Sequence, residues 1–60
     1  MFVTTKRCQQ LDRLRKKLGL AGHVKRDRTS HSYVLVDGDA VTPLGERWRD
    51  AESALRAKAR

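Results

Sequence analysis

The stretch His31-Ser-Tyr-Val-Leu-Val-Asp-Gly-Asp39 decides the fold. Its β-branched and aromatic residues favour a strand over residues 31–36. The dipeptide Asp37-Gly38 then indicates a tight hairpin, because a type I′ turn requires positive φ at both central residues. A basic, edge-like strand is expected over residues 22–28 and a short third strand over residues 39–42. The middle of the chain therefore predicts a three-stranded antiparallel meander.

An apolar stripe at helical spacing precedes these strands. Its members recur at intervals of three, three and four residues: Cys8, Leu11, Leu14 and Leu18. Thr4 or Thr5 can cap the N-terminus of such a helix, and Gly19 suits the left-handed position just beyond its C-terminus. The sequence therefore predicts a helix over about residues 5–18.

A second apolar stripe follows the strands. Pro43 and Gly45 are expected to end the third strand near the start of this stripe. The stripe has intervals of four, three and four residues: Leu44, Trp48, Ala51 and Leu55. It predicts a helix over about residues 45–58 that places Trp48 in the core. The order α-β-β-β-α predicts a single α+β domain over residues 1–60, with a three-stranded antiparallel sheet and two helices on one face.

The charge of the chain is strongly positive. Fourteen Lys and Arg residues against seven Asp and Glu residues give a formal charge of +7. Such a surplus on 60 residues implies an anionic partner, and nucleic acid is the first choice. The cations proposed to bind RNA lie on the first helix outside its apolar stripe and on the first predicted strand: Arg13, Lys16, Lys17, Lys25, Arg26 and Arg28. A solvated charged face is the alternative interpretation, and Tyr33 is the one strand aromatic available to stack on a base.

Composition excludes other classes of site. A single cysteine, Cys8, excludes an internal disulfide framework and a cysteine-based zinc site, and two histidines alone cannot hold zinc. We therefore expect no metal and no cofactor. No apolar run approaches the roughly 20 residues of a membrane span. These features favour the cytoplasm of a bacterium or phage-infected cell. A domain of this size is marginally stable alone, so a homodimer or a partner chain would help.

Two histidines are candidates for acid–base chemistry. His31 opens the strongest strand, and an imidazole titrates close to neutral pH. RNA cleavage by its own 2′-hydroxyl requires such a base, together with cations that stabilise the phosphorane. Lys25, Arg26 and Arg28 can supply these cations. The alternative is that His31 is a polar residue at the end of a strand and has no catalytic role. His23 is a second candidate, and its simpler interpretation is that it is an exposed residue at the start of a strand.

The segment from Gly19 to Arg60, with Ser30-His31 opening its second strand, resembles the HicA-type mRNA interferase toxins. These are small basic proteins with a fold similar to double-stranded-RNA-binding domains. The resemblance implies metal-free cleavage of mRNA by transesterification, with His31 as the catalytic residue and an acidic antitoxin on the open sheet face. It also implies that Val34 and Val36 face the helices, which would leave His31 and Tyr33 on the open face.

Two functions without catalysis remain open. A basic chain of 60 residues can be a phage-encoded inhibitor, such as an anti-CRISPR or host-takeover protein, that binds a host protein or a nucleoprotein complex. It can also be a plain nucleic-acid-binding module. An acidic gene product encoded beside the chain would favour the toxin, and a cluster of small phage genes would favour the inhibitor.

Overall fold

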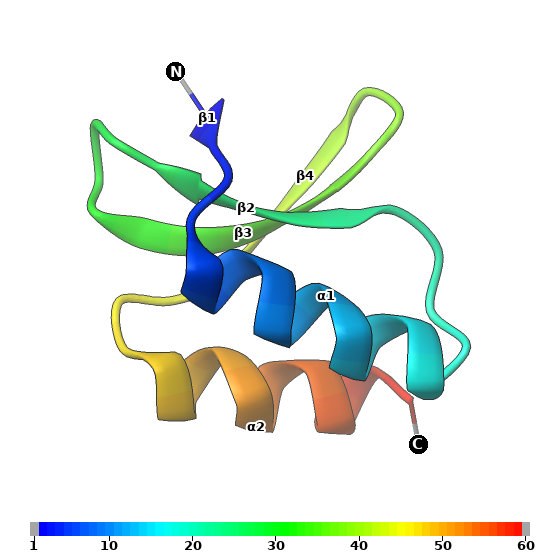
Figure 1. The fold of residues 1–60 in the computed structure, drawn as a ribbon. Helices are drawn as coiled ribbons and strands as arrows, with labels where there is room; N and C mark the ends of the chain where they lie inside the picture. The colour runs from blue at the N-terminus through cyan, green and yellow to red at the C-terminus, as the bar shows by residue number, and fades with distance from the viewer. Residues whose placement is uncertain (1, 60) are drawn as a thin grey trace.

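Across residues 2–59, which the computed structural model describes, two helices lie side by side on one face of a four-stranded antiparallel sheet (Figure 1). Along the chain the elements are β1 (Phe2–Val3), α1 (Lys6–Lys17), β2 (His23–Asp27), β3 (Ser32–Asp37), β4 (Ala40–Gly45) and α2 (Trp48–Lys58). The strands lie in sequence order, from β1 to β4. The predicted α+β class with both helices on one face is therefore confirmed, whereas the prediction of three strands is wrong.

The additional strand, β1, is only two residues long. It pairs with the C-terminal end of β2, where Phe2 lies opposite Asp27 and Val3 opposite Arg26. The chain then turns at Thr4 and Thr5 and enters α1. Because β1 is so short, it leaves the outer edge of β2 without a neighbouring strand at residues 23–25.

Strand β4 is longer than predicted, because Pro43 does not end it. β4 lies at the edge of the sheet, where a residue that lacks an N–H group can be accommodated. Tyr33 pairs with Gly45 and the next residue, Val34, with Pro43, so Leu44 is the extra residue of a bulge. This irregularity lets Leu44 enter the core, and it moves the start of α2 from the predicted residue 45 to Trp48.

The orientation of β3 is the reverse of the one that the resemblance implies. Tyr33 and Leu35 lie in the core with Val24, and only 3% of Tyr33 is exposed. Residues directly opposite each other on paired strands share a face, and Val24 lies opposite Leu35. Packing the larger Tyr33 and Leu35 against the helices buries more apolar surface than packing valines there. Val34 lies on the other face of the sheet, where it is still only 3% exposed.

Helix α1 begins and ends as its sequence predicts. Of the two candidate caps, Thr5 is the N-cap, and its hydroxyl oxygen accepts a hydrogen bond from the Cys8 N–H at 3.2 Å. Gly19 has a φ of +76°, and the Leu20 N–H donates back to the Arg15 carbonyl at 3.1 Å. Trp48 packs against the core as expected. Within residues 2–59, no helix has the length and apolar character needed to cross a membrane.

Candidate nucleic-acid interface

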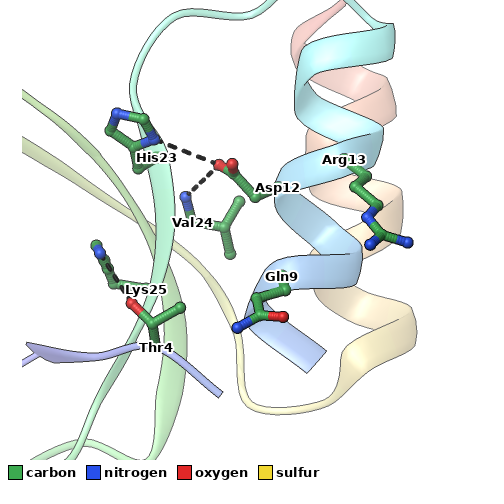
Figure 2. A pocket seen from close by; sticks show the side chains of 7 residues that line it. All are labelled: Thr4, Gln9, Asp12, Arg13, His23, Val24 and Lys25. Atoms are coloured by element: carbon green, nitrogen blue, oxygen red, sulfur yellow. Dashed lines mark hydrogen bonds and ion pairs between the residues drawn. The ribbon is translucent and has the colours of Figure 1, made fainter. Parts of the chain in front are cut away.

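A pocket of about 270 Å³ lies between α1 and the outer edge of β2 (Figure 2). Helix α1 contributes Gln9, Asp12 and Arg13, strand β2 contributes His23, Val24 and Lys25, and Thr4 closes the pocket where the chain leaves β1. The pocket exists because β1 pairs only with Arg26 and Asp27, so no strand covers β2 at residues 23–25. Its lining includes two of the cations predicted to bind RNA, Lys25 and, at the rim, Arg13, and also the second candidate histidine, His23.

Asp12 occupies the position that a longer β1 would fill. One of its carboxylate oxygens, Oδ1, accepts a hydrogen bond from the Val24 N–H at 3.1 Å and another from Arg15 Nε at 2.8 Å. Burial raises the pKa of Asp12, but the hydrogen bonds from Arg15 and from the Val24 N–H, with the charge of Arg15, outweigh it and lower the pKa below its ordinary value. The carboxylate thus supplies a hydrogen-bond acceptor for the Val24 N–H on the unpaired edge of β2, and Arg15 balances its negative charge.

His23 extends from β2 toward Asp12, with Nδ1 3.7 Å from the Asp12 Oδ1 (Figure 2). Its side chain is 71% exposed, so the rest of the ring is accessible to a ligand. The Asp12 carboxylate lies beside one ring nitrogen only, and the other nitrogen is left to a ligand. His23 therefore has a partner that sequence reasoning did not assign to it.

Lys25 is held by a neutral group. Its ammonium donates a hydrogen bond to the Thr4 hydroxyl oxygen at 2.8 Å. An ammonium has three donors, so this contact positions Lys25 and leaves both its charge and its remaining donors available. Within residues 2–59, neither Lys25 nor Arg13 forms an ion pair with a carboxylate. In Figure 2 the guanidinium of Arg13 extends away from β2, so Arg13 contributes to the rim of the pocket.

The other predicted RNA-binding residues lie elsewhere. Lys16 and Lys17 are exposed in the last turn of α1, and Arg28 is exposed in the turn after β2. Arg26 lies with its guanidinium carbon 5.3 Å from the centre of the Tyr33 ring, an arrangement that favours a cation over an aromatic face. The prediction that Tyr33 can stack on a base is wrong, because its ring is buried in the core beneath the helices.

His31 lies in the turn between β2 and β3 and not in the strand that it was predicted to open. It is exposed and has a φ of +56°, the one positive φ among the non-glycine residues from 2 to 59. Asp27 shapes this turn by accepting a hydrogen bond from the Thr29 N–H at 2.9 Å, and this bond lowers the pKa of Asp27. His23 begins β2, whereas His31 lies in the turn beyond its other end. Because a strand rises about 3.3 Å per residue, the two histidines are too far apart to contact the same phosphate.

Sequence reasoning missed the two residues that build the pocket. Thr4 was considered only as a helix cap, and nothing in the pattern links Asp12 to a strand that follows it by a dozen residues. Over residues 2–59, no group of three or more His, Cys, Asp or Glu side chains is arranged to hold a metal ion. No family model matches this sequence, and the searches of curated proteins and of solved structures also find no match.

Proposed function

We propose that this protein binds RNA through cations of α1 and β2. The observation that supports the proposal best is the pocket that Lys25 lines and Arg13 borders, because these cations come from separate elements and neither is paired with a carboxylate. Lys16 and Lys17 add exposed charge on the same helix as Arg13. Lysine and arginine side chains that neutralise backbone phosphates supply most of the non-specific affinity for nucleic acids.

We propose further that the bound RNA is cleaved, as the resemblance to HicA-type toxins implies. In this reaction His31 accepts the proton of a 2′-hydroxyl, the 2′-oxygen bonds to phosphorus, and the bond from phosphorus to the 5′-oxygen breaks. The leaving oxygen takes a proton from water, and the products are a 2′,3′-cyclic phosphate and a 5′-hydroxyl. Two features support His31 in this role: its exposure in a turn and its position three residues from Arg28, a cation that can stabilise the phosphorane.

Digestion of an RNA oligonucleotide by purified protein in the presence of EDTA tests the reaction. A residue that transfers a proton typically contributes about 10²–10⁴-fold to the rate, so His31→Ala is expected to lose that much activity. It should keep its melting curve and its RNA affinity, because His31 is exposed. Equal product formation by the wild type and His31→Ala would contradict the role of His31, and His23→Ala shows whether the other histidine carries the reaction.

The inhibitor function is favoured by a different observation, the apolar character of the open sheet face. Phe2 is 42% exposed and Val41 is 47% exposed, and the pairing of the strands places both on the face away from the helices. A host protein or an acidic antitoxin that covered this face would bury them. If the wild type binds no RNA even at low salt and instead forms a tight complex with a host protein, the inhibitor function replaces RNA binding.

A further inference from the structure

We infer that the pocket between α1 and β2 is a binding site for a phosphate group of an RNA strand, held by Lys25 and His23. The inference rests on the proposed RNA-binding function and assigns its most specific contact. His23 and Lys25 are two residues apart on β2, so both side chains leave the strand on the face opposite the buried Val24, away from the helices. They reach the pocket around the free edge of the strand, where His23 Nδ1 lies 3.7 Å from Asp12 Oδ1 and the Lys25 ammonium hydrogen-bonds the Thr4 hydroxyl at 2.8 Å. A phosphate at this edge, in the pocket that both side chains line, can contact both.

The charge in the pocket favours an anion. Asp12 is its one carboxylate, and Arg15 neutralises it through contacts of 2.8 Å from Nε and 3.4 Å from the second terminal nitrogen. Lys25 has no acidic partner among residues 2–59, and Arg13 adds a second uncompensated cation at the rim. The pocket therefore carries a surplus of positive charge from Lys25 and Arg13.

The pocket is also organised before a ligand arrives. The Thr4 hydroxyl fixes the Lys25 ammonium, and Asp12 occupies the Val24 N–H that would otherwise be free. Holding a flexible lysine in place reduces the entropy that it loses on binding. A volume of about 270 Å³ is below the range of roughly 300–1,000 Å³ typical of sites for drug-sized molecules. It suits a phosphate with part of its nucleotide.

His23 adds an exposed imidazole ring to this site. The charged groups around its ring are Asp12 and Arg15 of α1 and Lys25 of its own strand. On β3 its opposite residue is the uncharged Val36, and Asp37 follows at the end of that strand. The exposed ring can therefore contact a phosphate oxygen through a nitrogen.

Fluorescence anisotropy with a single-stranded, 5′-hydroxyl RNA measures the contact. For a single strand, each neutralised phosphate contributes about −0.7 to the slope of log affinity against log salt concentration. Lys25→Gln is expected to flatten the slope by about that amount. Lys58→Gln is the matched control: it removes the same charge from an exposed position on α2 and should leave the slope close to that of the wild type.

Two further variants test the sign of the charge and the role of His23. Asp12→Asn can still accept the Val24 hydrogen bond but removes the negative charge, so it should raise RNA affinity. A fall in affinity in a variant with an intact melting curve would show that Asp12 itself contacts the ligand and would contradict a phosphate in the pocket. His23→Ala removes the ring and should weaken RNA binding while its melting curve stays close to that of the wild type, because the side chain is 71% exposed.

The source of the phosphate is distinguished by the probe. A 5′-phosphorylated RNA of the same sequence binds more tightly than the 5′-hydroxyl form if the pocket takes a terminal phosphate, and equally if it takes a backbone phosphate. Competition by inorganic phosphate at constant ionic strength supports either source. If the wild type binds RNA but Lys25→Gln behaves as Lys58→Gln does, the pocket assignment is wrong and RNA binding stands. No RNA binding by the wild type contradicts both.

Discussion

At the scale of single residues, Asp12 links the stability of the sheet to pH. It accepts hydrogen bonds from Arg15 and from the Val24 N–H, and these lower its pKa in the folded chain below the ordinary value of 3.8. A carboxylate with a lowered pKa stabilises the folded state above its unfolded pKa, and this stabilisation is lost as the pH falls through the folded pKa. The contribution of Asp12 should therefore be complete above about pH 4 and lost in stronger acid.

Thermal melts of the wild type and Asp12→Asn between about pH 6 and pH 2 test this expectation. The wild type should melt at the higher temperature near pH 6, and the two melting temperatures should converge in acid. The comparison isolates Asp12 from Asp27, whose pKa is also lowered but which both proteins retain. A difference in melting temperature that stays constant over the whole interval would contradict the assignment.

Leu11 is the residue on which the core depends most clearly. It is fully buried between the helices and the sheet, as is Leu55, whereas Leu14 is only partly buried. Truncating a buried leucine typically costs about 2–5 kcal/mol, and a single core of this size rarely supplies more than about 3–5 kcal/mol. Leu11→Ala is therefore expected to be largely unfolded at room temperature by circular dichroism. Val41→Ala, at a site 47% exposed, is the control and should melt as the wild type does.

At the scale of elements, the two helices differ in how they begin. Thr5 caps α1 with its hydroxyl, but Arg47, the N-cap of α2, makes no side-chain hydrogen bond to the helix. The backbone of Arg47 is already extended, as a capping residue requires. Arg47→Ser should therefore supply the missing bond and stabilise the protein by about 1 kcal/mol relative to Arg47→Ala.

A difference of this size corresponds to roughly 4–8 °C in melting temperature for a domain of 60–100 residues. Arg47→Ala provides the comparison because both variants remove the same charge, so only the hydroxyl distinguishes them. Equal melting temperatures for the two variants would show that α2 gains nothing from a side-chain cap, and its stability would then depend on packing alone.

The elements also show which parts of the fold were predictable. Both helices and the β2–β3–β4 order follow from apolar spacing and from Asp37-Gly38, which are local signals. β1 has only two residues, too few for an alternating pattern to be recognised. The orientation of β3 was mispredicted because Tyr33, Val34 and Leu35 are all apolar, and either face could have been the buried one. The choice depends on packing against residues distant in sequence.

The candidate site was less predictable than the fold for the same reason. Arg13 and Lys25 were identified by charge, but the pocket that both line depends on where β1 ends. Asp12 and Thr4 acquire their roles only when α1 lies against β2. His31 was selected from its neighbours in sequence. In the structure it is His23, and not His31, that shares a pocket with a carboxylate, Asp12, and a cation, Lys25.

At the scale of the whole molecule, we propose that the charge of +7 serves to hold RNA. The most direct measurement is the affinity for single-stranded RNA between about 50 and 200 mM salt, compared between the wild type and the triple variant Arg13→Gln, Lys16→Gln, Lys17→Gln. The wild type should lose affinity steeply, with a slope of about −0.7 for each phosphate neutralised, and the triple variant should show a flatter slope. Absence of binding by the wild type at the lowest salt concentration would contradict the claim.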